Sequence, residues 1–329
     1  MNIKTILKHF ARNYLPWIIT IAALFFTFKG VDLGSIYEHI QTAKPIWLLY
    51  AVCLTFISYL LRAYRWEYFF IKPTMHFLDA VRVLFFGFFM NNILPARAGE
   101  LVRAHKGSQV TGETRTLVLA TIASERLADG LTISFMFLIF AAGLGDPKLS
   151  QELSLVSIAF GGAGIAIIVT LYFREYLFKL AEVLNKRFSS KASTYLLDRA
   201  KIFLNGLTPL LTPSKLPGSV GLSIIIWSIE LAVYYCIAQS YDSNLSLALC
   251  VLFMVAVNFS SLIPAAPGGI GVIELIASSA LISVGVDREH ALTMVITQHA
   301  IQYLVVGIPG ILILFLWKPK SQKAEPLKV

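Results

Sequence analysis

Hydrophobic residues in this chain are gathered into nine long apolar segments with short polar stretches between them. A helix needs roughly 20 apolar residues to cross a bilayer, and most of the segments approach that length. The pattern therefore predicts an all-α polytopic membrane protein that forms a single membrane domain over residues 1–329. The segments are 15–28, 45–61, 77–94, 117–143, 155–173, 220–240, 245–263, 270–285 and 291–317.

The composition agrees with this class. Of the 329 residues, 57% are hydrophobic and 14% are charged, and the mean hydropathy is +0.71. Soluble domains carry about 25% charged residues, so the composition excludes an ordinary soluble globule, a disordered chain and a disulfide-framed secreted domain. The net charge of +9 fits cytoplasmic loops that face anionic lipid, and we expect no nucleic-acid partner.

The positions of Lys and Arg predict how the segments lie in the membrane, because cytoplasmic loops are enriched in these residues. Simple alternation of full crossings would put two basic regions, 95–116 and 174–216, on the outside. The conflict disappears if 77–94 enters from the cytoplasm and turns back near Pro95, and if a second hairpin over 245–285 enters from outside. This layout has about six full spans and two re-entrant hairpins, with 23 Lys and Arg inside and 4 outside. It places both termini on the cytoplasmic side of the inner membrane.

The turns of the two predicted hairpins are similar in sequence. Asn-Ile-Leu-Pro-Ala-Arg-Ala-Gly at 92–99 aligns with Ser-Leu-Ile-Pro-Ala-Ala-Pro-Gly at 261–268, with Pro, Ala and Gly at the same spacing. Broken helices in two halves that enter from opposite faces are typical of the inverted repeats of secondary transporters. We therefore predict a first repeat over 45–143 and a second over 218–317. A short match by chance is the alternative.

Between the two halves, residues 174–216 alternate basic and apolar side chains. This mixture is typical of helices that lie on a membrane surface with their cationic side chains at the headgroups. We predict a cytoplasmic interfacial linker here, and a solvated linker is the alternative.

Charges at membrane depth mark the candidate site, because each of them needs a partner, water or a task. The first hairpin turn contains Asn92, Arg97, Glu100 and Arg103. Arginine offers phosphate oxygens a planar fork of donors, so we expect a lipid headgroup at this turn. The alternative is a structural pair between Glu100 and Arg103, which are three residues apart on a helix.

A second charged cluster lies within segment 117–143. Glu125 and Asp129 are four residues apart and share a helix face, and Arg126 can reach Asp129 at a spacing of three. Such a set predicts a mutually neutralising structural network. The functional alternative is a site for a proton or for the amine of a headgroup.

A third candidate is the glycine-rich turn of the second hairpin, with Gly268, Gly269 and Gly271 before a predicted helix that carries Glu274 in its first turn. Glycine lets the backbone approach a ligand or another helix closely, and a helix start attracts anions. Close helix packing is the alternative. Weaker candidates are polar residues within later spans, which more often form interhelical hydrogen bonds: Glu230, Gln298, His299 and Gln302.

These motifs, in this order, resemble the signature segments of the lysylphosphatidylglycerol synthase transmembrane-region family, also called the flippase-like domain family. The matching segments are 92–103, 125–129 and 267–274, and the resemblance extends over about residues 10–318. It implies a polytopic bacterial or archaeal membrane protein linked to lipid translocation. Fused members carry a soluble synthase domain that makes an aminoacylated lipid, and we expect no such domain in this chain.

From these observations we expect an integral membrane flippase or transporter that moves a phospholipid, or another lipid with a polar headgroup, across the cytoplasmic membrane. Its expected partner is a membrane lipid with an anionic or aminoacylated headgroup, and a lipid-synthesising enzyme is a second candidate partner. The sequence contains no catalytic motif, so we expect no enzymatic activity, no cofactor and no metal.

Two alternatives stay open at this point. The first is a non-transporting accessory or scaffold subunit of a lipid-synthesising enzyme, and the second is an intramembrane enzyme. Transport predicts a polar cavity that contains the charges, whereas a scaffold predicts that the charges pair off without a cavity. An enzyme predicts a nucleophile or a metal cluster near the middle of the membrane.

Overall fold

The computed structural model describes residues 3–70, 75–144, 147–187, 191–207, 212–261, 263 and 265–317. Within these ranges every regular element is a helix, which confirms the predicted all-helical class. The elements up to the middle of the chain are α1 (Ile3–Phe28), α2 (Leu33–Thr42), α3 (Pro45–Tyr68), α4 (Phe77–Ile93), η1 (Pro95–Arg97), α5 (Gly99–Thr111), α6 (Arg115–Phe140) and η2 (Ala141–Leu144). They are followed by α7 (Pro147–Tyr172), α8 (Arg174–Arg187), α9 (Lys191–Gly206), α10 (Leu216–Ser240), α11 (Leu247–Ser260), η4 (Pro267–Gly269), α12 (Val272–Ser283) and α13 (Arg288–Leu316).

Polar side chains fix where several of these helices begin. Thr114, Ser246 and Asp287 each accept a hydrogen bond from the third amide of the helix that follows, α6, α11 and α13 respectively. Each cap satisfies an N–H group that has no partner within the helix. At the other end of a helix, Gly112 stops α5 with a φ of 73°, a left-handed conformation that glycine adopts easily.

Two helix pairs are broken by short irregular segments, as predicted for the hairpins. The first runs α4, η1 and α5, and α5 packs back against α4. The approach is close because a Cβ on Gly99 would lie 2.3 Å from the carbonyl oxygen of Gly87. The second runs α11, η4 and α12, which also pack against each other. Pro264, where the second turn was predicted, lies outside the described residues.

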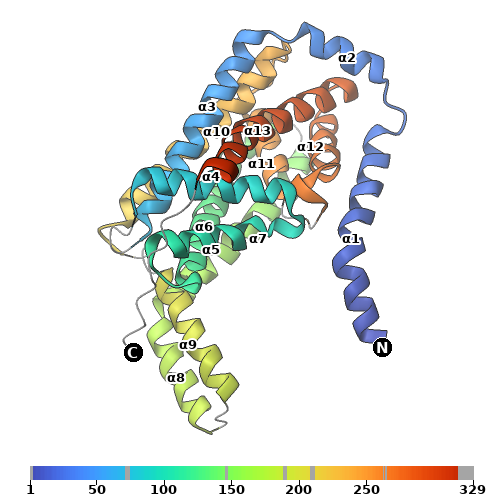
Figure 1. Cartoon of the computed structure of the whole chain (residues 1–329). Coiled ribbons are helices and arrows are strands. Elements are labelled where there is room, and N and C mark those ends of the chain that lie inside the picture. The colour runs from blue at the N-terminus through green and yellow to red at the C-terminus, as the bar shows by residue number, and fades with distance from the viewer. Residues whose placement is uncertain are drawn as a thin grey trace.

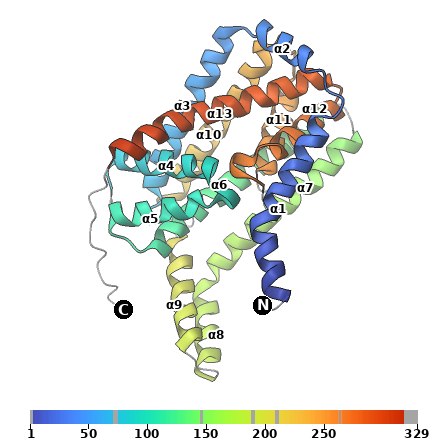
Figure 2. The ribbon, with the colours of Figure 1, turned by 45° about the vertical axis from the view of Figure 1, so that its right-hand side comes forward.

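The helix pair α3 and α10 lies side by side and connects the two halves of the chain (Figures 1 and 2). Each of the two is followed by the broken pair that packs on it, so α4 contacts α3 and α11 contacts α10. Likewise α13 packs across α4, and α6 packs across α11. Exchanging α3–α6 for α10–α13 therefore reproduces these contacts, as an internal repeat requires. The inverted relation and the repeat boundaries, 45–143 and 218–317, stay predictions.

Several helices meet the requirements for crossing a membrane. By length and hydropathy, α3, α10 and α13 each suffice. The part of α1 from Leu15 to Phe28 and all of α2 meet the same test together, with a bend of 80° between them. The chain is thus a multi-pass membrane protein, while the number of about six spans and the cytoplasmic position of both termini stay predictions.

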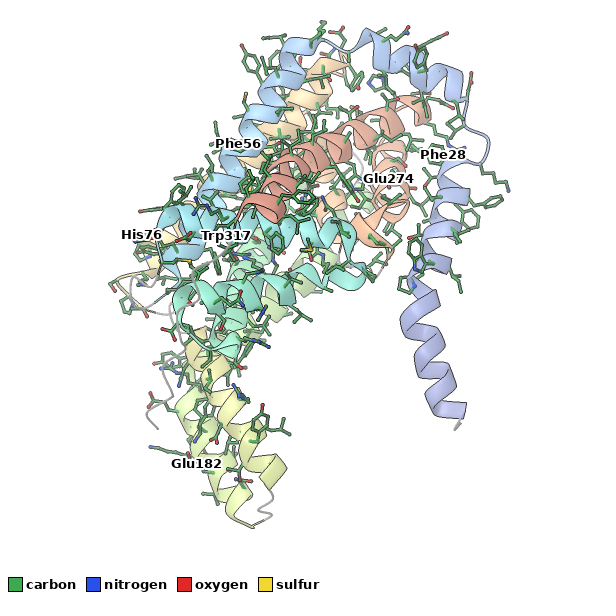
Figure 3. The ribbon with its side chains drawn as sticks, viewed as in Figure 1. Phe28, Phe56, His76, Glu182, Glu274 and Trp317 are labelled. Atoms are coloured by element: carbon green, nitrogen blue, oxygen red, sulfur yellow. The ribbon has the colours of Figure 1, made fainter. Side chains whose placement is uncertain are left out.

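The predicted linker 174–216 contains two helices, α8 and α9. They pack against each other and project from one end of the bundle (Figures 1 and 2). An ion pair joins them, with Lys201 Nζ 2.5 Å from Glu182 Oε1, and Figure 3 shows Glu182 on this projecting pair. Their placement on the cytoplasmic leaflet stays a prediction.

Candidate functional site

A cavity of about 730 Å³ lies between the two broken segments. Much of the apolar lining comes from α6 and α7. Polar groups of the lining come from α3, α4, η1, α5, α6, α10, α11 and α13. Polar and charged residues of the lining include Tyr59, Arg62, Asn91, Asn92, Arg97, Glu100, Arg126, Asp129, Trp227, Glu230, Tyr234, Asn258, Ser261, Gln298, His299, Gln302 and Tyr303. A polar cavity with these charges is the feature that transport predicts and a scaffold does not.

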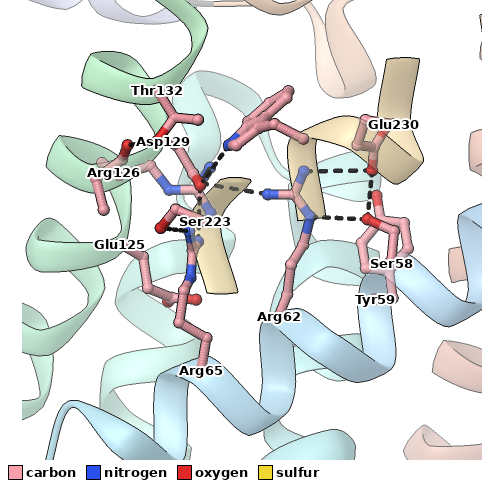
Figure 4. A network of polar contacts seen from close by, with 12 residues as sticks. Ser58, Tyr59, Arg62, Arg65, Glu125, Arg126, Asp129, Thr132, Ser223 and Glu230 are labelled. Carbon is pink, nitrogen blue, oxygen red and sulfur yellow. Dashed lines mark hydrogen bonds and ion pairs between the residues drawn. The ribbon is translucent and has the colours of Figure 1, made fainter. Parts of the chain in front are cut away.

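Asp129 of α6 is the centre of an arginine network in this cavity (Figure 4). Its carboxylate accepts hydrogen bonds from Arg65 at 2.7 Å and from Arg62 at 3.3 Å, both on α3. The indole N–H of Trp227 on α10 donates to the same carboxylate at 2.9 Å. Asp129 is 4% exposed, and a buried carboxylate needs such a complete set of partners.

Arg62 extends the network from α6 to α10. It donates to Glu230 at 3.2 Å, and the Ser58 hydroxyl donates to the same Glu230 oxygen at 2.7 Å. The guanidinium also lies 4.7 Å from the Trp227 ring centroid, which adds a cation–π contact. Arg62 thus holds a carboxylate from each half of the chain.

Arg126 joins the first broken pair to the network. Its side chain lies 3.4 Å from Glu100 on α5 and 3.8 Å from Asp129 one turn along α6. The second contact confirms the predicted pairing within α6. The pair between Glu100 and Arg103, the structural alternative for this turn, does not form, because Glu100 contacts Arg126 on the neighbouring helix instead.

Arg97 differs from the other arginines of the cavity. It ends η1 with a φ of 55°, a left-handed conformation that is uncommon for a residue with a side chain. Its guanidinium donates to the Ser261 hydroxyl at 2.5 Å, so it reaches from the first broken segment to the second. Among the described residues, no carboxylate lies within 4.0 Å of its guanidinium nitrogens.

The charges that meet here do not cancel. Counted as ionised, the four arginines of the network, Arg62, Arg65, Arg97 and Arg126, share three carboxylates in the described part of the chain, those of Glu100, Asp129 and Glu230. Arg65 binds Asp129 from outside the lining, and the other six residues line the cavity. The surplus positive charge belongs to Arg97, because each of the other arginines already has a carboxylate. Among the described residues of the lining, Arg97 is thus the arginine without a bound carboxylate.

Two predicted site residues, Arg103 and Glu125, lie outside the cavity. They form an ion pair with nitrogen and oxygen 2.6 Å apart, and both side chains are 2% exposed. The Arg103 guanidinium lies 4.2 Å from the Trp66 ring centroid. This pair joins α5 to α6 in the core, and its geometry gives no access to a headgroup.

The glycine-rich turn of the second broken segment divides in the same way. Gly268 and Gly269 line the cavity, whereas Gly271 and Glu274 do not. Glu274 instead accepts a hydrogen bond from the Gly271 N–H at 2.6 Å and lies 2.5 Å from His299 on α13. The predicted anion site at the start of α12 therefore already holds the protein's own carboxylate.

Seven of the eleven predicted site residues line the cavity, namely Asn92, Arg97, Glu100, Arg126, Asp129, Gly268 and Gly269. Sequence analysis missed Arg62 and Arg65, which it counted as loop charges after a segment ending at 61. That assignment is wrong, because α3 continues to Tyr68 and buries both arginines, which are 7% and 0% exposed. Their spacing of three residues on one helix face was the signal that could have identified them. The four weaker candidates, Glu230, Gln298, His299 and Gln302, all line the cavity.

Comparison with known proteins establishes the relationship of this chain. Residues 14–310 match the lysylphosphatidylglycerol synthase TM region. The chain belongs to this family. The match extends over both broken segments and the whole cavity, so the resemblance first noted in three short motifs is confirmed along most of the chain.

Relatives among curated proteins are archaeal membrane proteins of the UPF0104 group. A UPF0104 membrane protein of Pyrococcus horikoshii is 24% identical over 324 residues, which cover 91% of this chain and 95% of the relative. One of Methanothermobacter thermautotrophicus is 24% identical over 317 residues, or 89% of this chain and 92% of the relative. A third, of Methanocaldococcus jannaschii, is 25% identical over 242 residues, or 71% and 99%. The chain is thus similar to membrane proteins over nearly its full length.

Proposed function

We propose that this protein moves an anionic membrane lipid between the leaflets of the cytoplasmic membrane, with the lipid phosphate bound at Arg97. The observation that carries the proposal is the polar cavity between two broken helices, in which Arg97 has no carboxylate partner among the described residues. Broken helices around a polar site are the architecture by which many transporters bind polar cargo inside a membrane.

The walls of the cavity support a lipid as cargo. A lipid presents a polar headgroup and apolar chains together, and the cavity has a polar side next to an apolar side formed by residues such as Leu127, Leu131 and Ile167. The headgroup would lie against Arg97 and the amide side chains of Asn92 and Gln298, while the chains leave along the apolar side.

The pairing of the carboxylates favours an anionic headgroup over an aminoacylated one. Glu100, Asp129 and Glu230 are each bound to an arginine. An added amine would have to compete with a guanidinium for any of them. A phosphate meets no such competition at Arg97, where it would gain charge-assisted hydrogen bonds.

Reconstitution in liposomes tests the proposal. Purified protein would be placed in vesicles with a trace of fluorescent phosphatidylglycerol, and the loss of signal on adding an impermeant quencher would report lipid movement. Arg97→Ala should slow movement about 10- to 100-fold, because hydrogen bonds to a charged group contribute about 1.5–3 kcal/mol. The rate of lipid movement in Arg97→Lys should lie between those of wild type and Arg97→Ala, since lysine keeps the charge but loses the planar fork.

Two variants serve as controls. Arg82→Ala removes an arginine from the half-exposed Asp79–Arg82 pair and should leave movement unchanged. Ser261→Ala removes the hydroxyl that Arg97 contacts without changing the charge, and should have a small effect. Wild-type rates in a folded Arg97→Ala protein would reject the phosphate role of Arg97. Wild-type protein that moves no lipid would instead favour the non-transporting scaffold.

A further inference from the structure

A histidine and a glutamate form a buried pair in the wall of the cavity, beside the second broken segment. His299 Nδ1 lies 2.5 Å from Oε1 of Glu274, and His299 Nε2 lies 3.1 Å from the carbonyl oxygen of Gly268. The second oxygen of Glu274 accepts from the Gly271 N–H at 2.6 Å. The two side chains are 8% and 9% exposed, and Figure 3 shows Glu274 within the bundle on α12.

This geometry determines which protonation state of the pair allows both ring contacts to be hydrogen bonds. Both ring nitrogens of His299 face oxygen atoms, yet a neutral imidazole has one N–H and one lone pair. With an ionised Glu274, one of the two contacts would therefore set a lone pair against an oxygen. Both contacts become hydrogen bonds when the pair carries one more proton, on the ring or on the carboxyl group. Both contacts can be hydrogen bonds at the same time only in the state with this extra proton, and in that state the pair is uncharged overall.

We propose that the His299–Glu274 pair is the proton-binding site through which a proton gradient drives lipid movement, an inference that rests on the function proposed above. Gly268 belongs to η4, so the proton helps to hold the second broken segment. That segment contacts η1, whose last residue is Arg97. Proton and anion therefore act on two segments that touch, a contiguous route by which one site can bias the other.

Other ionisable groups surround the pair without replacing it. The ring of Tyr303 lies edge-on to His299 with centroids 4.8 Å apart, and the Tyr59 hydroxyl of α3 accepts from Gln302 of α13 at 3.2 Å. Apart from the pair itself, the Arg, Lys, Asp, Glu and His residues of α13 and of the helices packed against it are Arg62, Arg65 and Glu67 on α3, Asp79 and Arg82 on α4, Glu38 and His39 on α2, Glu230 on α10, and Arg288, Glu289 and His290 at the start of α13 itself. Tyrosines and cysteines also lie on these helices: Tyr37 on α2, Tyr50, Cys53, Tyr64 and Tyr68 on α3, and Tyr234, Tyr235 and Cys236 on α10. In the described part of the chain, the ion pairs that these residues form do not include His299 or Glu274.

One proton matches one anionic phospholipid in charge. A phosphodiester headgroup carries a single negative charge, so lipid and proton together bring no net charge into the hydrocarbon, where an unpaired charge is costly. The distribution of the lipid between the leaflets should then depend on the pH difference across the membrane and not on the membrane potential. For one proton per lipid, each pH unit supports up to about a tenfold concentration ratio between the leaflets.

Vesicles with a pH gradient test this coupling. The membrane would be phosphatidylcholine with a trace of fluorescent phosphatidylglycerol, and potassium with valinomycin would hold the potential at zero. Wild-type protein should enrich the tracer in one leaflet, by up to about tenfold per pH unit, and reversing the gradient should reverse the enrichment. His299→Gln replaces the ring with an amide that takes up no proton, so it removes the histidine–carboxylate pair; it should still move the tracer but leave both leaflets equal.

Glu274→Gln should lose the enrichment in the same way, which covers the case in which His299→Gln does not fold. His290→Gln is the matched control, because it makes the same substitution on the same helix outside the cavity, and it should enrich the tracer like wild type. Wild-type protein that equalises the leaflets under every gradient would overturn the coupling and leave the proposed function standing.

Wild-type protein that moves no lipid at any pH would overturn the proposed function instead. The proton site is then tested separately by measuring the midpoint temperature of thermal unfolding in detergent at several pH values between about 5 and 9. A proton that stabilises the folded pair makes the wild-type midpoint fall as pH rises, more than in His299→Gln. Identical pH profiles would overturn the proton site as well.

Discussion

The buried Arg103–Glu125 pair allows a sharp test of whether a charge in this protein is structural or functional. Both side chains are 2% exposed and their charged atoms are 2.6 Å apart. Arg103→Met would leave the Glu125 carboxylate buried without a counter-charge, and breaking such a pair costs about 3–5 kcal/mol of unfolding free energy. Glu125→Met should cost less, because the Trp66 ring 4.2 Å away still stabilises the arginine by about 2 kcal/mol. About 1–3 kcal/mol should then be lost.

The double variant decides between the interpretations. With both partners replaced by methionine, no charge is left buried, and such replacements are often close to neutral. We therefore expect the double variant to lie within about 1 kcal/mol of wild type and above either single variant. Unfolding would be followed by circular dichroism in mixed micelles as denaturing detergent is added. Asp79→Asn, in a half-exposed pair, is the control and should cost less than about 1 kcal/mol.

Two results would refute this reasoning. A double variant as unstable as the worse single variant would mean that the two charges act separately. A stable double variant that no longer moves lipid would show that Arg103 and Glu125 take part in lipid movement, contrary to their position outside the cavity.

Two further predictions concern the core of the bundle. Asp129→Asn should lower the unfolding free energy by about 3–5 kcal/mol, because the buried Arg65, at 0% exposure, would keep its charge without a carboxylate partner. The same detergent titration measures this loss of stability. A loss below about 1 kcal/mol would contradict the stabilising role of the Arg65–Asp129 pair. Gly99→Ala should reduce the yield of folded protein in size-exclusion chromatography, since the new Cβ would lie 2.3 Å from a backbone oxygen and overpacking costs about 1–3 kcal/mol or more. Gly221→Ala is its control, because a Cβ there meets nothing within 4 Å, and an equal loss in both would refute the argument.

The sequence predicted helix positions well where hydropathy alone decides them. Segment 77–94 became α4, Phe77–Ile93. Segment 45–61 ended too early, because hydropathy falls where Arg62 and Arg65 begin, although the helix continues through them. Their carboxylate partners lie on α6 and α10, and a local pattern contains no information about partners that only tertiary packing supplies.

The same limit explains the wrong pairing in the first hairpin. Spacing along one helix suggested Glu100 with Arg103, a contact that contributes about 0.2–0.5 kcal/mol on a helix surface. Instead α5 packs against α6, which offers each residue a partner across the interface, Arg126 and Glu125 respectively. Tertiary pairs in the interior outweigh a weak local one.

The histidine–glutamate pair shows a third case. Glu274 and His299 were each recognised as polar residues within apolar segments. They are 25 positions apart on separate helices, so no helical register connects them. Only the packing of α12 against α13 brings them together.

The arginine network also has a consequence for biosynthesis. The α3 helix is made with Arg62 and Arg65 already in it, while the nearest carboxylate partner, Asp129, comes 64 residues after Arg65 and Glu230 comes 168 residues after Arg62. An arginine at the centre of a lone inserted helix costs about 2.5–3.5 kcal/mol, and one nearer the end costs less. Arg62 and Arg65 lie in the last third of α3, so they make α3 by itself less stable in the bilayer by a smaller amount. Arg62 and Arg65 gain their first carboxylate partner, Asp129, only when α6 has been synthesised. The network is complete only when α10, which carries Glu230, has also been synthesised.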